Sequence, residues 1–199
     1  VFDDVKGNEL IDRIAYTKAV SYHLNNPGLA KWRSDMWYMD DTALEFARYE
    51  PTTGHRPEAE NEIIADTKTL EALGVPAEIG ATVTLDYEIK GKEYTTDFTL
   101  CGFWETDSLS NIGRIIVSKA FLDSHADLLT YTYPVDNDYS GIVTAYIMFR
   151  GSGSVEEKLQ QLLTETGYTC DTLGGQPTDE NYIVARVSPA YQSLSLIHI

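Results

Sequence analysis

The most informative part of this sequence for its fold is Gly54-His55-Arg56-Pro57-Glu58-Ala59-Glu60-Asn61-Glu62-Ile63-Ile64-Ala65. Its first half combines polar residues with Gly54 and Pro57, a composition typical of a turn. Residues 62–65 carry one glutamate followed by three apolar side chains, which predicts a short strand. The stretch therefore predicts a turn that leads directly into a strand.

A helix and a hairpin are predicted to follow this strand. Asp66 or Thr67 can cap the helix, because a side-chain oxygen there accepts a hydrogen bond from an unpaired N–H group, and Gly74 can end it. Residues 82–89 alternate apolar and polar side chains, and residues 94–103 return with a β-rich composition after a glycine turn. This alternation predicts a hairpin with one buried face.

The flanking sequence predicts further helices and strands. Residues 8–16 place Leu10, Ile11 and Ile14 on one helical face, which predicts an amphipathic helix. We also expect strands at residues 19–24, 114–117, 142–149 and 182–187, and helices at 119–127 and 155–166, the two helices being capped by Ser118 and Ser154. This mixture favours an α+β fold.

The charge of the chain restricts its partners. Its 199 residues include 31 Asp and Glu against 15 Lys and Arg, for a formal net charge of −16. Nucleic acids and anionic lipid surfaces bind clusters of basic residues, so neither is expected as the main partner of this acidic chain. A cationic partner is compatible with the charge. The longest stretch free of charge and strong polarity, residues 141–149, is far shorter than the roughly 20 residues that cross a bilayer.

A search for catalytic and metal-binding patterns finds none. The four histidines lack the i, i+4 spacing of a metal pair, and residues 136–141 begin like a calcium loop but have Ile147 where the closing acid belongs. The paired carboxylates Asp3-Asp4 and Asp40-Asp41 fit no catalytic pattern, and the chain has neither a Gly-x-Ser-x-Gly elbow nor a phosphate-binding glycine loop. We therefore expect no catalytic residue, no cofactor and no metal, and hence no enzyme.

Two segments rich in aromatic residues are the candidate contact sites. Exposed tyrosine and tryptophan often mark interfaces, because they offer a large contact area at low entropic cost. The alternative is that these rings cover a small core under long loops. We expect both segments to be loops with solvent-accessible tips, and the candidate contact residues are Trp32, Trp37, Tyr38, Tyr131, Tyr133 and Tyr139.

The stretch at residues 54–65 resembles the signature of the extracytoplasmic domain of MacB-like and FtsX-like ABC transporter permeases, in which a Gly-Arg-x-Pro turn precedes Asn/Asp-Glu-Ile/Val-Ile/Val. The sequence after this stretch also resembles the family, at residues 70–74, 79–85 and 98–103. The matched run covers about residues 54–117. The residues that carry the resemblance, with an expected structural role, are Gly54, Arg56, Pro57, Asn61, Glu62, Gly74, Gly80 and Gly102. The chain departs from the pattern at His55, which occupies the usual position of the arginine.

The resemblance implies a two-lobed α+β domain on the extracytoplasmic side of a cell membrane, attached through membrane helices outside this sequence. Lobe A would comprise about residues 1–50 and 141–193, and lobe B, β-rich with the hairpin, about residues 51–140. Such a domain is non-catalytic. It would bind, gate or sense an exported peptide-like or lipid-like substrate or a partner protein. Its partners would be an ABC ATPase, a second permease copy or half, and a cationic peptide or lipoprotein-like substrate.

Three further points stay open at this stage. A freestanding secreted or surface-anchored binding module is the alternative function, and an acidic hydrolase is a third. Residues 194–199 look like the translation of a sequencing adapter, so we expect a non-native tail there, the alternative being a natural apolar lead-in to a membrane helix. Pairing of Cys101 with Cys170 is also left open.

Overall fold

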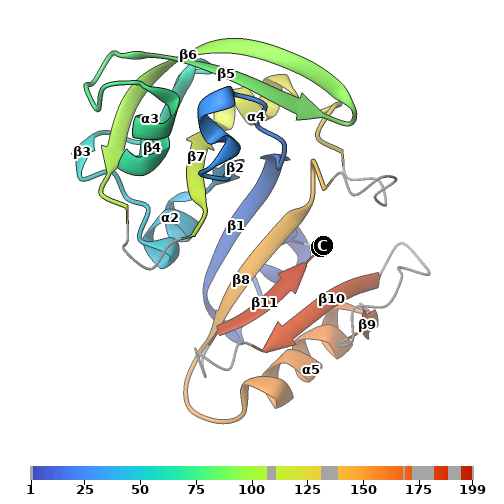
Figure 1. The fold of residues 1–199 in the computed structure, drawn as a ribbon. Coiled ribbons are helices and arrows are strands. Elements are labelled where there is room, and N and C mark those ends of the chain that lie inside the picture. Colours follow the sequence, from blue (N-terminus) through green and yellow to red (C-terminus); the bar gives the residue numbers. More distant parts are fainter. Residues whose placement is uncertain are drawn as a thin grey trace. The chain divides into compact units, whose positions relative to one another are not determined.

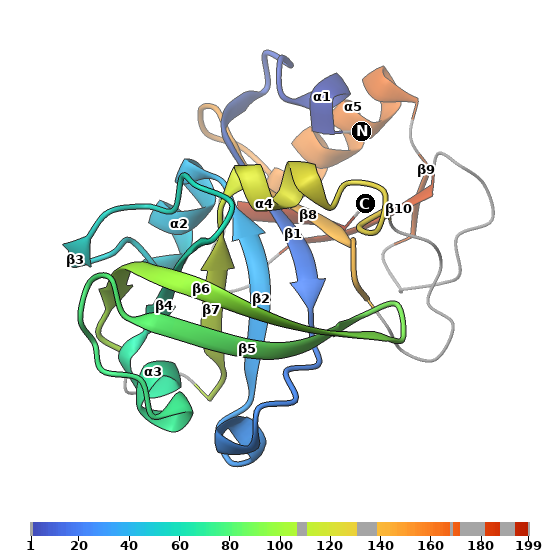
Figure 2. The same ribbon diagram turned by 90° about the horizontal axis from the view of Figure 1, so that it is seen from above.

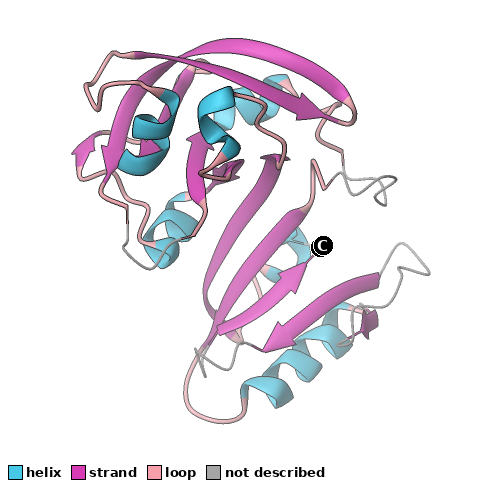
Figure 3. Cartoon of the chain, viewed as in Figure 1, coloured by secondary structure: helices cyan, strands magenta, loops and turns pink. Residues whose placement is uncertain are grey.

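The computed structural model describes residues 2–106, 111–130, 139–167, 169–171, 182–187 and 194–198. The chain forms two compact units. The terminal unit comprises Val1–Thr17, Asp40–Ala43 and Val143–Ile199, and the central unit comprises Lys18–Met39 and Leu44–Ile142. Helices and strands are mixed along the chain, which confirms the predicted α+β class (Figure 3). The lobe limits expected from the sequence, and the suggestion that residues 194–199 are non-native, stay predictions.

The central unit contains a mixed sheet in the order β3-β6-β4-β7-β2, with β5 paired to β6 (Figures 1 and 2). Its strands are β2 (Ser34–Met39), β3 (Thr53–Gly54), β4 (Glu62–Asp66), β5 (Thr82–Ile89), β6 (Lys92–Trp104) and β7 (Gly113–Val117). Its helices are η1 (Pro27–Ala30), α3 (Thr67–Leu73) and α4 (Lys119–Ser124). β6 is parallel to β4 and antiparallel to β3 and β5, so it holds three strands together.

The terminal unit contains the sheet order β8-β11-β10-β9 and two helices. Its elements are α1 (Phe2–Val5), β8 (Val143–Phe149), α5 (Val155–Thr166), β9 (Thr169–Asp171), β10 (Tyr182–Val187) and β11 (Leu194–His198). Figure 1 shows α5 running alongside β10 and β11. The apolar stripe of α5 is buried in one cluster with β8, and that cluster contains Val155, Leu159, Leu162, Leu163, Ala145, Ile147 and Phe149.

The structure confirms the helix caps that the sequence predicts. Asp66 accepts a hydrogen bond from the N–H of Thr69 at the start of α3, and Gly74 ends that helix in the left-handed conformation at φ 70°. Ser118 and Ser154 cap α4 and α5 in the same way. The hairpin is confirmed as β5 and β6, with positive φ angles at Lys90 and Gly91 in its turn.

The helix predicted at residues 8–16 is wrong, because β1 (Ile11–Ser21) is a strand. From Ala15 to Ala19 its side chains alternate between buried and half-buried, as in a sheet. Residues far along the chain supply backbone hydrogen bonds to it: the N–H of Ala19 donates to the carbonyl of Ile142 at 2.9 Å, and the N–H of Gly141 donates to the carbonyl of Ala19 at 2.9 Å. Long-range pairing therefore overrides the apparent helical period.

Two elements near residue 40 are also absent from the sequence prediction. β2 pairs in parallel with β7, with Trp37 opposite Ile116 and Tyr38 opposite Val117. α2 (Asp41–Ala47) follows, and the carboxylate of Asp40 accepts a hydrogen bond from the N–H of Ala43 at 2.8 Å.

Among the described residues, none of the helices has the length and apolarity that a bilayer crossing needs.

Candidate functional site

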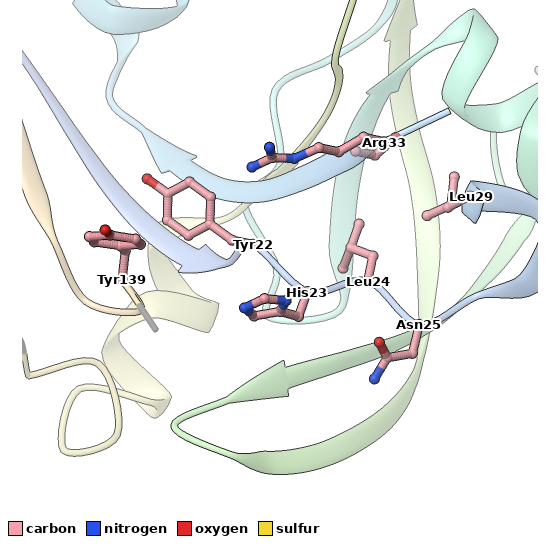
Figure 4. A pocket seen from close by; sticks show the side chains of 8 residues that line it. Tyr22, His23, Leu24, Asn25, Leu29, Arg33 and Tyr139 are labelled. Carbon is pink, nitrogen blue, oxygen red and sulfur yellow. The ribbon is translucent and has the colours of Figure 1, made fainter. Parts of the chain in front are cut away.

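A pocket of about 580 Å³ lies in the central unit (Figure 4). The loop after β1, η1, the start of β2 and the residue Tyr139 before β8 form its walls. Its lining residues are Tyr22, His23, Leu24, Asn25, Leu29, Arg33, Ser34 and Tyr139. The walls therefore combine aromatic, aliphatic and polar surface, as ligand pockets do.

Three aromatic rings, which we call the aromatic corner, meet at one side of this pocket: Tyr22, Trp37 and Tyr139. Tyr22 contacts Trp37 edge to face at 5.4 Å between centroids and Tyr139 in the same way at 5.8 Å. Trp37 also packs on the buried cluster around Trp104, whereas Tyr139 is 39% exposed. The corner thus has a fixed base and an open edge.

The pocket carries basic groups although the chain is acidic. His23 and Arg33 are among its lining residues, and none of the eight is acidic. Arg33 Nε lies 3.3 Å from Asp35 Oδ1, and Arg114 Nη1 donates to Asp35 Oδ2 at 3.0 Å. Asp35 is 2% exposed and Arg33 has a 61% exposed side chain, so Arg33 extends from a buried anchor to solvent.

The structure separates the predicted aromatic contact residues. Trp37 and Tyr38 are half-buried residues of β2, not of a loop, so that part of the prediction is wrong. Tyr22, which sequence reasoning missed, joins Trp37 to Tyr139. The sequence shows that Tyr22 alternates with polar neighbours, which predicts a strand. It does not show which rings Tyr22 contacts.

Trp32 has other neighbours. Its Nε1 donates to Thr69 Oγ1 at 3.1 Å, and Lys68 Nζ lies 5.0 Å from the centroid of its ring. Trp32 thus contacts α3 instead of the aromatic corner. Tyr131 and Tyr133 lie outside the described residues.

The turn at residues 54–61 is held by its own polar side chains. Arg56 forms an ion pair with Glu50, in which Nε donates to Oε2 at 3.0 Å. Pro57 follows, and Asn61 pairs with β6 through its carbonyl, which accepts from the N–H of Thr99 at 2.7 Å. Glu62 Oε2 accepts two backbone hydrogen bonds from residues 58 and 59 at 2.8 and 2.9 Å, and these bonds lower the pKa of its carboxyl group.

The glycines of the matched run occupy positions that a side chain would disturb. Gly54 has φ 85°, and a Cβ there would lie 2.1 Å from the carbonyl oxygen of Cys101. A Cβ on Gly102 would lie 2.6 Å from the carbonyl oxygen of His55. Gly80 has φ 89° and donates from its N–H to Leu100 at 2.8 Å. The close approach of the turn to β6 therefore depends on Gly54 and Gly102.

A second group of side chains could hold a metal ion. His55, Glu62 and Cys101 each offer one ligand atom, and the three atoms lie within 4.8 Å of one another. The sequence predicted no metal site, because the histidines lack the i, i+4 spacing of a metal pair and the calcium-like loop lacks its closing acid. The folded chain brings these three residues together from separate segments. The feature of the sequence that pointed to this group is His55, which occupies the position of the arginine in the resembled pattern.

No protein-family model matches this chain, and no curated protein matches it. Solved structures with similar folds include the periplasmic region of MacB from Actinobacillus actinomycetemcomitans, at 10% identity and a TM-score of 0.48, covering 83% of this chain and 74% of that one. They also include the extracellular domain of the noncanonic ABC-type transporter YknZ from Gram-positive bacteria, at 14% identity and a TM-score of 0.49, covering 83% and 82%. Both TM-scores are below 0.5.

Proposed function

We propose that this chain is the extracytoplasmic domain of an ABC transporter permease, which binds, gates or senses an exported substrate without catalysing a reaction. The observation that supports this most is the folding of residues 54–104. They form the succession of turn, strand, helix and hairpin that the resemblance implies, as β4, α3, β5 and β6. The glycines and the Arg56–Glu50 ion pair hold that turn against β6.

The energy for transport would come from a partner. The sequence has no glycine-rich loop followed by Lys-Ser/Thr, which is the element that cradles the phosphates of ATP in such transporters. An ABC ATPase subunit or domain would therefore hydrolyse ATP, and a second permease copy or half would complete the transporter. The membrane helices of the permease would connect this domain to both.

The pocket and the aromatic corner are the proposed contact site for the substrate. Tyr22, Trp37 and Tyr139 suit an acyl chain or a ring, and the nearby Arg33 and His23 suit a neutral or acidic polar end. A peptide-like or lipid-like amphipathic molecule offers both parts. The net charge of −16 favours cationic partners over the rest of the surface.

The transporter assignment is tested by recovering the complete gene with its neighbours. We expect apolar segments of about 20 residues on both sides of this domain and an adjacent ABC ATPase gene. The detergent-solubilised permease should then retain the ATPase during purification. A gene that encodes a secreted protein without such segments would overturn the assignment and favour the freestanding binding module.

The contact site is tested by titrating tryptophan fluorescence with two probes, a diacylated lipopeptide and a cationic amphipathic peptide. We expect Tyr139→Ser to weaken binding of the preferred probe at least about fivefold, because its ring is the exposed edge of the corner. Leu128→Ser is the matched control, since Leu128 is 37% exposed and is not a lining residue of the pocket. Equal loss in both variants, or none in either, would contradict the proposed site.

A further inference from the structure

Three side chains with metal-binding atoms converge in the central unit. The ligand atoms of His55, Glu62 and Cys101 lie within 4.8 Å of one another. An imidazole nitrogen, a carboxylate oxygen and a thiolate sulfur are together a ligand set of zinc and of similar divalent cations. The three residues follow β3, begin β4 and lie within β6, so only the folded sheet brings them together.

A β-bulge sets the position of Cys101. In the pairing of β4 with β6, Ile63 lies opposite Leu100 and Ile64 lies opposite Gly102, so Cys101 is the extra residue of β6. Bulges change the direction of a side chain and are common next to functional sites. Here the bulge occurs at the residue that would supply the sulfur ligand.

The backbone brings His55 to the same place. The N–H of His55 donates to the carbonyl of Cys101 at 3.0 Å, and the absence of a side chain on Gly102 leaves room for the His55 carbonyl. His55 Nδ1 lies 2.8 Å from the carbonyl oxygen of Arg56. A hydrogen bond from Nδ1 to a carbonyl is the usual support of a metal-binding histidine, because it leaves the lone pair on Nε2 for the metal.

Glu62 is held as a charged ligand. Its Oε2 accepts the backbone N–H groups of Glu58 and Ala59 at 2.8 and 2.9 Å. These two bonds, with a smaller contribution from His55, lower the pKa of the carboxyl group. Oε1 makes no hydrogen bond with any described residue, so it can face a cation. The carboxylate is therefore ionised and fixed in direction before any metal arrives.

Cys101 holds its proton when no cation is bound. The side chain is buried, and its Sγ donates to the carbonyl of Ile63 at 3.3 Å. Burial and the nearby charge of Glu62 raise the pKa of the thiol to about 12. Cation binding would break the S–H bond, pass the proton to the buffer and form a sulfur–metal bond.

We propose that His55, Glu62 and Cys101 bind one divalent cation of the zinc type, with solvent in the remaining coordination position. Ligand atoms around tetrahedral zinc lie about 3.5 Å apart, so atoms that now lie within 4.8 Å of one another have to close by at most about 1.3 Å. His55 is exposed and can make that movement. The bound cation would link the segment after β3 to β4 and β6. This site is independent of the proposed transporter role, and either can fail without the other.

The test uses the 199-residue chain, free of any histidine tag and dialysed against a chelator, titrated with Co²⁺ and then with Zn²⁺. We expect one Co²⁺ per chain, visible-range bands of tetrahedral cobalt, and a near-ultraviolet thiolate-to-cobalt band that Zn²⁺ abolishes. Cys101→Ser should lose the thiolate band. His55→Ala should bind at least about tenfold more weakly.

Matched variants distinguish this site from other histidines and cysteines. Cys170→Ser and His125→Ala should keep the spectrum and affinity of the unchanged chain. Because His55 is exposed, His55→Ala is expected to fold normally, which its thermal unfolding temperature without metal checks. Absence of saturable binding, a thiolate band that survives Cys101→Ser, or equal weakening by His55→Ala and His125→Ala would each overturn the proposal.

Discussion

The carboxylate of Asp66 accepts a hydrogen bond from the backbone N–H of Arg114 at 2.7 Å. The same carboxylate accepts the N–H of Thr69 at 3.0 Å and the hydroxyl of Thr106 at 2.8 Å, and Asp66 is 2% exposed. One buried side chain therefore caps α3 and also ties that helix to β7 and to the residues after β6.

Replacing Asp66 by alanine should lower the free energy of unfolding by about 3 kcal/mol, because it removes a helix cap and leaves buried donors without acceptors. Urea titration followed by tryptophan fluorescence measures this change. Asp123→Ala is the control, since its ion pair with Lys119 is exposed, and it should change stability by less than about 0.5 kcal/mol. Similar effects of the two substitutions would show that the buried network contributes little.

The two arginines around Asp35 should differ in their effect on stability. Arg114, with 21% of its side chain exposed, is the closer partner of the buried carboxylate, whereas Arg33 is 61% exposed. Arg114→Ala should lower the free energy of unfolding by about 2 kcal/mol, because it leaves a buried charge with only a solvated partner. Arg33→Ala should lower it by less than about 1 kcal/mol. Urea titrations of both variants check this order, and the reverse order would contradict it.

Gly54 should tolerate alanine much less than Gly74 does. Both have positive φ angles, 85° and 70°. A Cβ on Gly54 would lie 2.1 Å from the carbonyl oxygen of Cys101, whereas a Cβ on Gly74 would meet nothing within 4 Å. We expect Gly54→Ala to cost about 3 kcal/mol or more and Gly74→Ala about 1 kcal/mol, measured by thermal unfolding. Equal costs would mean that the backbone angle alone matters.

Cys101 should react slowly with iodoacetamide in the folded protein. The thiol of Cys101 has a pKa of about 12, whereas the ordinary pKa of a cysteine is 9. At pH 8 its thiolate fraction is therefore roughly a thousandfold smaller than that of an ordinary cysteine. The Cys170→Ser variant leaves Cys101 as the one cysteine of the sequence. Mass spectrometry measures the rate at which this variant is alkylated, in buffer and in urea. The native rate should be at least a hundredfold lower, and comparable rates would contradict the burial of the thiol.

Stability should decrease at alkaline pH because of the same thiol. Its folded pKa is raised above the unfolded value of about 9, so the thiol contributes stability below pH 9 that is lost as the pH rises toward 12. The free energy of unfolding of the unchanged chain should therefore fall faster than that of Cys101→Ala between pH 8 and pH 10.5. Parallel pH profiles would show that Cys101 ionises equally well in both states.

Local sequence signals predict the parts of the fold that local interactions determine. The caps at Asp66, Ser118 and Ser154 each satisfy an N–H three residues later, so the sequence alone carries the information. The β5–β6 hairpin is local in the same sense. Only the end of β1, residues 19–21, was predicted as a strand. The rest of β1 and all of β2 could not be predicted in this way, because these strands bond to residues such as Gly141 and to β7, far along the chain.

The same distinction between local and long-range information applies to the candidate site. Trp37 and Tyr139 were selected for their residue type, but only the structure shows that Tyr22 joins them and that Trp32 contacts α3 instead. The group of His55, Glu62 and Cys101 had no spacing to identify it, since the bulge in β6 and the pairing of three strands create it.

The parallel pairing of β2 with β7 has a consequence for how the central unit folds. β5 and β6 meet across a two-residue turn, so this hairpin can form within microseconds. Ser34 lies opposite Gly113, about 80 positions later, and closing so long a loop is slow. We expect the hairpin, with β4 and α3 docked on it, to be the early folding nucleus. We expect the strand that carries Trp37 to join last, in which case the pocket and the aromatic corner form only at the end of folding.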